Sequence, residues 1–390
     1  MRVGLIGTHP SNNILIQHHN CGQTAISNAH QPITVARIDG KAKRAVIRTH
    51  PMHIPLSRTR ACDYCARPVA QVGLSDPMRA MHYMTYGGPL ALVDLPQPLA
   101  GPRQVVVRVH TASVNPVDWK MASGKLRLLM PQRLPCVPLA DVAGEIVQVG
   151  ADAGDFKPSM RVHARIAGHN GGACAEFAVV GVDVLAPMPT DMSFEQAAGL
   201  PLAGLTALQG LRDEAGLPLA GATERVLIVG ASGGVGHLAV QIAVAAGAQV
   251  TGVCSAANTA MVTGLGAHHV IDYRAPNAFS GLESFDIILD CVGGSPSAWL
   301  SMLVAGGRFA STMPGPAVIG RSLLNALTSK RVRPVMLRSN RADLQILGQL
   351  AAAGRLKVVV DSRFALDQLS SAWERSKSGR AAGKILINVN

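Results

Sequence analysis

The sequence predicts an α/β chain: a small antiparallel, barrel-like β domain followed by a doubly wound parallel sheet. Three observations predict this fold. Short β-rich runs separated by Gly- and Pro-rich turns fill residues 104–180, strands and helices alternate from residue 225 onward, and a glycine-rich turn joins the first of those strands to the first of those helices. With 390 residues, 48% hydrophobic and 15% charged, the chain has room for roughly two to three domains and is too apolar for long disorder.

Residues 1–77 are predicted to be a basic, poorly ordered N-terminal extension. They hold nine Lys and Arg against three Asp, so their net charge of +6 is half of the +12 of the whole chain. They show no sustained period of 2 or 3.6 residues, and Cys62 and Cys65 form a lone C-x-x-C without the second pair that a zinc site needs. The whole chain has seven cysteines, an odd and sparse number, which favours free thiols and a reducing, cytoplasmic location.

The barrel-like domain is predicted to span residues 78–200. Its strands are expected at Gln104–Thr111, Val142–Val149, Arg161–Ile166 and Ala175–Val180. Ser193 suits a helix N-cap, with Gln196 at the position where a capping box needs Glu or Gln. A helix is therefore expected to begin directly after Ser193.

Strands and helices alternate over residues 201–344, which indicates a parallel sheet with helices on its faces. The expected strands are Arg225–Val229, Gln249–Cys254, His269–Ile271, Asp286–Leu289 and Arg308–Ser311, with helices at Val235–Ala246 and Ala257–Leu265. The last part of the chain is expected to form helices at Leu344–Ala353 and Asp367–Ser378 and strands at Lys357–Val360 and Ile385–Val389.

The turn that follows the first strand of this alternation has the spacing A-x-G-x-x-G, with Ala231, Gly233 and Gly236 at the three small positions. The first allows a tight turn, the second lets the backbone approach a pyrophosphate, and the third lets the helix pack closely on the strand. The anion would lie on free N–H groups at the start of the helix. The predicted cofactor contacts in the turn are Ser232, Gly233, Gly234, Val235 and Gly236. Because strand, turn, helix and second strand are all in place, dinucleotide binding is favoured over a purely structural turn.

The end of the second strand predicts which dinucleotide binds. NAD sites usually place Asp or Glu there, but no acidic residue occurs between Arg225 and Asp272. Ser255, Asn258 and Tyr273 are instead predicted to form a polar pocket for a 2′-phosphate, with Arg274 nearby. The alternative for Ser255 is a plain helix N-cap. NADP is favoured over NAD.

Several motifs in order make the chain from residue 78 to residue 390 resemble the zinc-independent medium-chain dehydrogenase/reductases, which include quinone oxidoreductases and reticulon-interacting mitochondrial oxidoreductases. The motifs are Ser113–Lys120, Ala198–Ala207, the glycine-rich turn, Leu265–Ala267, Val270–Tyr273, Phe285–Asp290, Val292–Gly294 and Gly383–Ile385. The resemblance implies a GroES-like β-barrel domain at residues 78–200, completed by residues 345–390, and a Rossmann NADP-binding domain at residues 201–344. It also implies a homodimer.

The resemblance also predicts that this part of the chain holds no metal. Zinc-dependent members of the superfamily have Cys where Asn115 stands, His where Ala140 stands and Cys close to Leu202, and Asn, Ala and Leu do not supply a zinc site. Two further departures lie on barrel turns. The family commonly has Gly at the positions of Leu139 and Ser159, which puts the local geometry and stability of these turns in question.

The expected activity is hydride transfer from NADPH to a quinone or an α,β-unsaturated carbonyl, because such substrates delocalise the incoming charge without a zinc ion. By resemblance, Asn115 lies at the reaction centre and binds an oxyanion with its amide. Thr206 and the backbone of Cys291–Val292 would position the nicotinamide, and Lys384 would reach the cofactor from the last strand. Lys120, Asp118 or solvent is open as the proton source, with a structural role favoured for Asp118.

Two other functions remain open at this point. The first is a non-enzymatic NADPH-binding protein with a nucleic-acid or protein partner, suggested by the basic run of Lys330, Arg331, Arg333, Arg338 and Arg341. The second is a zinc-type alcohol dehydrogenase, which the missing ligands disfavour. The expected partner is a small quinone or enone, with no nucleic-acid and no membrane partner, since no charge-free stretch is apolar enough to span a bilayer.

Overall fold

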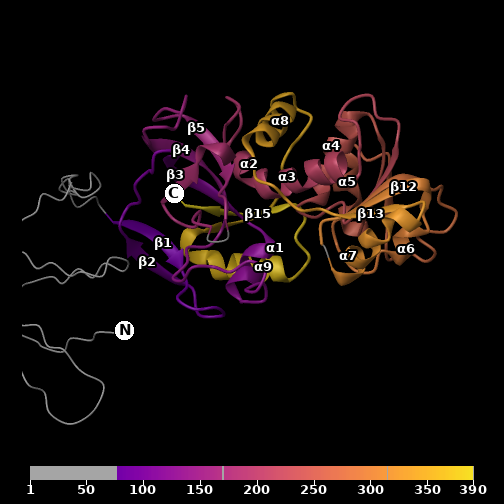
Figure 1. Cartoon of the computed structure of the whole chain (residues 1–390), viewed down its shortest axis with the longest axis horizontal. Coiled ribbons are helices and arrows are strands. Elements are labelled where there is room, and N and C mark those ends of the chain that lie inside the picture. Colours follow the sequence, from indigo (N-terminus) through magenta and orange to yellow (C-terminus); the bar gives the residue numbers. More distant parts are fainter. Residues whose placement is uncertain (1–76, 169–170, 314, 390) are drawn as a thin grey trace, which may run out of the picture. The chain divides into compact units, whose positions relative to one another are not determined.

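The computed structural model describes residues 77–168, 171–313 and 315–389, so the predicted N-terminal extension lies outside the described residues apart from its last residue. The described part forms two domains, each built around its own sheet. Figure 1 shows the first in indigo and magenta, joined by the yellow C-terminal segment, and the second mainly in orange. The expected GroES-like barrel domain and Rossmann domain are therefore both present.

The first domain is a mainly antiparallel barrel-like sheet. Its strands are β3 (Gln104–Val114), β4 (Asp141–Val149), β5 (Arg161–Arg165), β6 (Phe177–Gly181), β7 (Leu185–Pro187), β14 (Val360–Ala365) and β15 (Lys384–Asn388). The order is β14-β15-β3-β4-β5-β7, and β6 also pairs with β3. The start of β3 pairs with β6 and its end with β15, so the long strand passes from one neighbour to another and the sheet curls. A hairpin of β1 (Met78–His82) and β2 (Ala91–Leu95) lies beside it.

The barrel core follows from strand alternation. In β3, Val105, Val107 and Val109 are fully buried, whereas Arg108 between them is exposed. The core is completed by α9 (Leu369–Lys377), which contributes Leu369 to it. The C-terminal segment thus belongs physically to the first domain, as the resemblance implied.

The second domain is a six-stranded parallel sheet. Its strands are β8 (Arg225–Val229), β9 (Gln249–Cys254), β10 (His269–Asp272), β11 (Phe285–Asp290), β12 (Leu303–Ser311) and β13 (Arg331–Pro334). They lie in the order β10-β9-β8-β11-β12-β13, which is the doubly wound order 3-2-1-4-5-6. The direction of winding reverses between β8 and β11, and ligands bind such sheets at the carboxyl ends of the strands beside that point.

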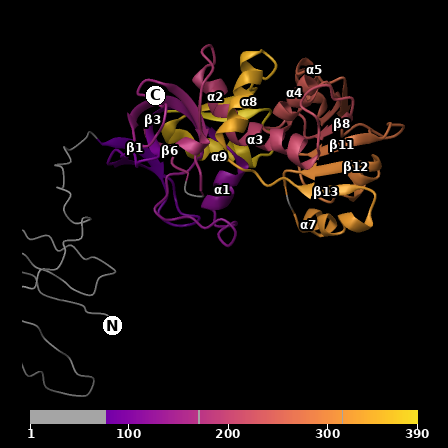
Figure 2. The same cartoon turned by 45° about the horizontal axis from the view of Figure 1, so that its top comes forward.

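Helices cover both faces of this sheet, and β8 is buried on both sides (Figure 2). Val226 and Ile228 enter one core with α3 (Pro201–Gln209) and α4 (Gly236–Ala246). Leu227 and Val229 face the other core, on the side of α6 (Ser297–Leu300) and α7 (Pro316–Leu323). The remaining helices are α1 (Pro116–Ala122), α2 (Phe194–Gly199), α5 (Thr259–Gly264) and α8 (Arg341–Ala352), with a π-helical turn at Gly210–Glu214 and 3₁₀ segments at Val182–Val184, Ala256–Asn258, Asn325–Leu327 and Leu366–Gln368.

Most predicted elements are confirmed within a few residues, and the strands β8 and β9 match their predicted bounds. The helix after Ser193 is confirmed too, and the Ser193 hydroxyl accepts a hydrogen bond from Gln196 N. The prediction of a strand at Lys357–Val360 was wrong: β14 begins only at Val360, because side-chain amides occupy the backbone groups of the residues before it. The helix predicted at Ala257–Leu265 is split into a 3₁₀ turn and the shorter α5.

Two glutamine side chains hold the segment before β14. The backbone N–H and C=O of Val358 bond to the Gln196 side chain on α2, each at 2.8 Å. The same groups of Lys357 bond to the Gln241 side chain on α4, at 2.8 and 2.9 Å. Each amide thus replaces a strand partner, and the chain is fixed between α2 and α4 as it returns to the first domain.

Both unusual barrel turns contain a residue in the left-handed region. Leu139 and Ser159 each have φ of +67°, a conformation that costs an L-residue roughly 1–2 kcal/mol relative to glycine. These are the two positions at which the family commonly has Gly. The unusual geometry that the sequence indicated for these turns is therefore present, and its effect on stability stays a prediction.

No helix among residues 77–168, 171–313 and 315–389 combines the length and the apolar character needed to cross a bilayer.

Candidate functional site

The glycine-rich turn lies between β8 and α4, at the point where the sheet reverses its winding. Gly230 has φ of +77°, so the left-handed residue is the glycine before the motif and Ala231 is tolerated at its first position. The N–H groups of Gly230 and Ala231 both donate to Val253 O on β9, at 3.0 and 2.9 Å. The turn is thereby anchored to the neighbouring strand.

The two later glycines have different physical roles. A Cβ on Gly236 would lie 2.0 Å from Gly230 O, a distance no side chain tolerates, because α4 packs directly on the turn. A Cβ on Gly233 would meet only Gly230 O, at 3.3 Å. The space in front of Gly233 is therefore open, as approach of a ligand to the backbone requires.

Four N–H groups of this turn remain available for an anion. Among the described residues, no acceptor is found for the backbone N–H of Ser232, Gly234, Val235 or Gly236. They lie at the N-terminus of α4, where the helix dipole also favours negative charge. The turn therefore offers free N–H groups of the kind that bind a pyrophosphate.

His237 stabilises this turn, and sequence reasoning missed it. Its backbone N–H and its Nδ1 both lie within hydrogen-bond distance of Gly233 O, at 3.1 and 2.9 Å. Burial lowers the pKa of His237 to about 4, so the ring is neutral at pH 7 and donates from Nδ1 to the carbonyl. The sequence feature that could have identified this residue is a histidine directly after Gly236, the last glycine of the motif.

Two of the residues predicted to form a phosphate pocket, Ser255 and Asn258, lie together after the end of β9. The Asn258 amide donates to the hydroxyls of Ser232 and Ser255, at 3.1 and 3.4 Å. Ser255 is the N-cap residue of the 3₁₀ segment Ala256–Asn258, as the alternative had it, but its hydroxyl makes no capping hydrogen bond and accepts from Asn258 instead. Tyr273 N donates to Cys254 O, and Arg274 lies over the Tyr273 ring, at 5.2 Å from its centroid. Ser232, Ser255, Asn258, Tyr273 and Arg274 therefore gather at one strand end.

A second cluster, buried between the domains, contains Asn115 and Lys384. Lys384 Nζ donates to Asn115 Oδ1 at 2.5 Å and lies 3.9 Å from Asp141 Oδ2. The Asn115 amide donates to Asp141 Oδ2 at 2.9 Å and to Ser113 O at 3.4 Å. Asp141 Oδ1 accepts Leu202 N at 3.0 Å. Asn115, Asp141 and Lys384 are each at most 3% exposed.

The Asp141 carboxylate and the Lys384 ammonium each favour the charged form of the other. Burial raises the pKa of Asp141, and the Lys384 ammonium counteracts that rise. Burial lowers the pKa of Lys384, and the Asp141 and Asp118 carboxyls counteract that fall. A buried ion pair therefore holds the Asn115 amide between a cation and an anion.

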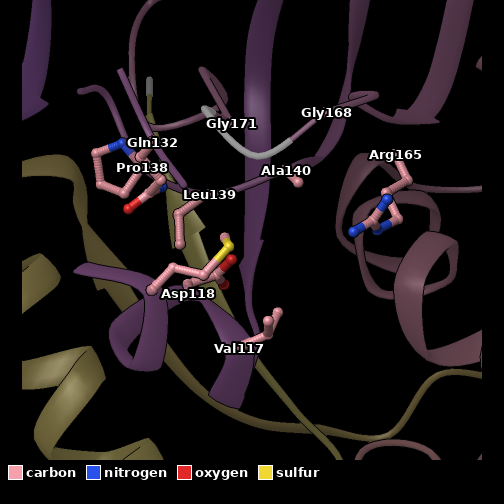
Figure 3. A pocket seen from close by; sticks show the side chains of 10 residues that line it. Val117, Asp118, Gln132, Pro138, Leu139, Ala140, Arg165, Gly168 and Gly171 are labelled. Carbon is pink, nitrogen blue, oxygen red and sulfur yellow. The ribbon is translucent and has the colours of Figure 1, made fainter. Parts of the chain in front are cut away.

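Asp118 is the fourth member of the cluster. Its Oδ2 accepts the backbone N–H of Asn115 at 2.7 Å and so caps α1, which is the structural role favoured for it. Its Oδ1 is buried without a partner, and burial raises its pKa to about 7. Figure 3 shows Asp118 beside a cavity with Arg165 across from it. The free space in this cavity is about 10 Å³, close to what one water molecule needs.

The glycine-rich turn and the buried cluster are directly connected. Gly383 N donates to Ser232 O at 2.9 Å. The next residue, Lys384, passes the turn, since its Cδ lies 3.6 Å from the position of a Cβ on Gly234. A ligand on the turn would therefore lie beside the strand that carries Lys384.

The other two predicted nicotinamide contacts are the backbone of Cys291–Val292 and the Thr206 side chain, and they differ in how they lie relative to the glycine-rich turn. The segment after β11 lies against the turn, because a Cβ on Gly230 would be 2.7 Å from Val292 and 3.7 Å from Cys291. Asp290 shapes this segment by accepting the N–H groups of Val292 and Gly293, at 3.0 and 2.9 Å. Thr206 donates its hydroxyl to Leu202 O within α3 at 2.7 Å. The hydrogen bonds of the described residues do not connect it to the turn.

Comparisons with known proteins support the family. Residues 101–190 match the family described as alcohol dehydrogenase GroES-like domain, and residues 265–387 match the zinc-binding dehydrogenase family. The chain is 37% identical over 323 residues to the chloroplast envelope quinone oxidoreductase homolog of Arabidopsis thaliana, covering 80% of this chain and 98% of the relative. This decides the family. The chain belongs to the medium-chain dehydrogenase/reductase family.

Other members of the medium-chain dehydrogenase/reductase family agree. The chain is 32% identical over 325 residues to the mitochondrial NAD(P)H oxidoreductase RTN4IP1 of Homo sapiens, covering 74% of this chain and 82% of the relative. The solved structure of the quinone oxidoreductase from Coxiella burnetii superposes with a TM-score of 0.72 at 29% identity, covering 80% of this chain and 100% of that one. The protein is therefore an oxidoreductase of this family that uses a nicotinamide cofactor.

The family description mentions zinc, but the residues at the corresponding place do not fit that ion. Asn115 is already bonded to Asp141 and Lys384, Ala140 has no donor, and Leu202 offers only the N–H that Asp141 accepts. The ammonium of Lys384 would also repel a divalent cation. The described residues hold no group of three or more His, Cys, Asp and Glu able to bind a metal. Such a donor set does not match tetrahedral zinc.

Asp141 is the other functional residue that sequence reasoning missed. It is fully buried at the start of β4 and connects α3, Asn115 and Lys384. A lone carboxylate between Ala140 and an apolar strand was the available signal, because a buried charge needs a partner. The sequence did not show that its partner, Lys384, is 243 positions away (384 minus 141).

Proposed function

We propose that this oxidoreductase uses NADPH to reduce quinones or α,β-unsaturated carbonyls without a zinc ion. The observation that carries the proposal is the direct connection of the glycine-rich turn to a buried Lys384–Asn115–Asp141 cluster. A cofactor on the turn would place its reactive ring near a cluster whose cation is an ammonium and not a metal.

NADPH is preferred over NADH in this proposal because of the groups at the end of β9. Ser232, Ser255 and Asn258 offer hydroxyl and amide donors there, and Arg274 adds a positive charge beside Tyr273. The nearby carboxylate of Asp272 belongs to β10 and accepts the backbone N–H of Arg274. A 2′-phosphate would therefore meet polar hydrogens where an NAD site usually has an acid.

The substrate class follows from the charge available at the reaction centre. A bound nicotinamide supplies the hydride, and the reduced substrate acquires negative charge. In this structure both Asn115 amide hydrogens point to Asp141 and Ser113, whereas the Lys384 ammonium has three N–H groups and gives one to Asn115. We propose that Asn115 holds this cation toward the reacting atoms. One ammonium suits a hydroquinone anion or an enolate, whose charge is delocalised, better than a localised alkoxide.

The experiment follows absorbance in two assays: NADPH oxidation with a panel of quinones, enones and alkenals, and NADP⁺ reduction with simple alcohols. We expect turnover with quinones or enones, tighter binding of NADPH than of NADH, and no loss of activity after dialysis against a chelator. Stoichiometric zinc in the active protein would refute the zinc-free part, and tighter NADH binding would refute the NADP preference.

Two variants separate the roles. Asn115→Ala should lower kcat by about 100-fold or more and change the Kd for NADPH by less than about threefold. The reverse pattern would reject its place at the reaction centre. Ser255→Asp should shift preference toward NADH, because a carboxylate repels the 2′-phosphate and binds ribose hydroxyls.

The nucleic-acid alternative loses support in the structure. Arg333 and Arg338 lie 3.6 and 3.1 Å from Glu214 and Asp213, and Lys330 donates to Leu300 O. Much of the basic run is therefore used within the fold. The homodimer that the resemblance implied stays a prediction, which the mass of the protein in solution tests.

A further inference from the structure

A loop after α1 has an unusual surface. Residues 123–133, called the basic loop here, contain Leu128 and Leu129, which are 92% and 80% exposed. Leu128 is the most exposed large apolar side chain of the part of the chain that the structure describes. Two adjacent leucines held in water in this way indicate a surface that contacts something apolar.

The sequence on both sides of these leucines is basic. Between Asp118 and Asp141 the sequence has Lys120, Lys125, Arg127 and Arg133 and no acidic residue. Lys120 and Lys125 lie over the Trp119 ring, at 5.4 and 5.9 Å from its centroid. The salt bridges found among the described residues include neither these two lysines nor Arg127. The loop therefore presents positive charge beside its apolar tip.

The tip is an ordered turn. Leu126 O accepts the N–H groups of Leu129 and Met130, at 3.0 and 2.7 Å. At the base of the loop, Gln132 N donates to the Tyr86 hydroxyl at 2.7 Å, and the Tyr83 hydroxyl donates to Gln132 Oε1. The two leucines are consequently exposed on a fixed support and lose little conformational freedom on binding.

The base of the basic loop is close to the buried cluster. Asn115 directly precedes α1 and the basic loop directly follows it, and a helix of seven residues is about 10 Å long. Figure 1 shows α1 beside α9 in the first domain. At the base of the loop, Gln132 lines the same cavity as Asp118 (Figure 3).

We propose that the basic loop docks on an anionic lipid bilayer, with Leu128 and Leu129 inserted among the acyl chains and the cations on the headgroups. This combination of apolar tip and basic flanks is what interfacial membrane binding requires. A protein partner fits less well, because two leucines cover far less than the roughly 1,200–2,000 Å² of a stable protein interface. Nucleic acid fits less well because the neighbouring aromatic ring, Trp119, is covered by lysines.

This docking extends the proposed function, on which its catalytic consequence rests. Quinones and enones with long apolar chains partition into bilayers, and a protein bound through this loop would receive them about one short helix from Asn115. The sequence-based expectation of no membrane partner rested on the lack of a segment that could span a bilayer. A two-residue tip inserts only into the surface of a bilayer, so that expectation does not apply to it.

The binding test uses the full-length protein and sedimentation with lipid vesicles, and it needs neither cofactor nor substrate. We expect binding to vesicles with about 30% phosphatidylglycerol, and much weaker binding to pure phosphatidylcholine or in high salt. The variant Leu128→Asp/Leu129→Asp should lower the partition coefficient at least about tenfold. The control is Leu99→Asp, since Leu99 is 67% exposed and precedes the far end of β3. All variants retain the basic residues 1–77, so their difference isolates the tip.

The activity test compares two quinones. The double variant should reduce a water-soluble short-chain quinone at the wild-type rate and a long-chain quinone in anionic vesicles at least about tenfold more slowly. Wild-type binding by the double variant would overturn the docking proposal, as would a change of its oligomeric state or loss of short-chain activity. A wild-type protein that binds vesicles but reduces neither quinones nor enones would refute the proposed function alone.

Discussion

The buried carboxyl of Asp118 makes a quantitative prediction about stability and pH. Burial raises its pKa from an ordinary 3.8 to about 7. Because the folded state holds this proton more tightly than the unfolded state, the stability contribution is full below pH 3.8 and is lost as pH rises toward 7. At about 1.36 kcal/mol for each pH unit, the total loss is roughly 4 kcal/mol, of which more than half falls between pH 5 and pH 8.

The substitution Asp118→Asn isolates this effect. The amide oxygen can still accept the backbone N–H of Asn115 that caps α1, but the group no longer titrates. Wild-type stability alone would not show the effect, because buried His163 and His237 have pKa values lowered to about 4. They bind fewer protons in the fold and stabilise it as pH rises from 4 to 6.5, which opposes Asp118.

The assay is urea unfolding of wild type and Asp118→Asn at pH 5 and at pH 8, with Asp155→Asn as the exposed control. We expect the free energy of unfolding of Asp118→Asn to gain roughly 2–3 kcal/mol relative to wild type between the two pH values, a midpoint shift of roughly 1 M urea. The control should show no such gain. Parallel stability curves for wild type and Asp118→Asn would refute the reasoning, because Asp118 would then be ionised in the fold at no cost.

Three further predictions concern the strained turn at Ser159, the buried ion pair of Lys384 and Asp141, and the two glycines Gly233 and Gly236. Ser159→Gly should stabilise the protein by about 0.5–1 kcal/mol, raising Tm by roughly 2 °C, because Ser159 is exposed with φ of +67°; an unchanged or lower Tm would contradict the strain. Lys384→Met should lower the free energy of unfolding by about 3–5 kcal/mol, because it leaves the buried Asp141 carboxylate without a partner. The double variant Lys384→Met/Asp141→Asn should lower it by much less, and equal unfolding midpoints for the two variants would argue against the ion pair. Gly236→Ala should prevent stable folding, whereas Gly233→Val should fold but lose NADPH binding. Circular dichroism reports the folding and fluorescence titration the binding, and a Gly233→Val protein that binds NADPH normally would refute the placing of the pyrophosphate.

The comparison of Gly233 with Gly236 shows how much of the site was predictable. The A-x-G-x-x-G spacing assigned close ligand approach to one glycine and helix packing to the other, and the space around each agrees. Such local geometry is encoded by a few consecutive residues, since a turn, a helix start and a strand depend on neighbours in the sequence. The same reason explains why β8 and β9 were predicted at their observed bounds.

The sequence by itself determined most local elements, the doubly wound parallel sheet implied by their alternation, and the polar end of β9. Only the tertiary structure decided that Lys384 bonds to Asn115, that Asp141 lies between them, and that Gln196 and Gln241 replace strand partners before β14. Apart from the bond between Asn115 and Asp141, which are 26 positions apart, these contacts join residues more than 100 positions apart, and no periodicity or spacing reports them. Their geometry depends on how the two domains pack, because a buried charge or amide finds its partner only when the chain is folded.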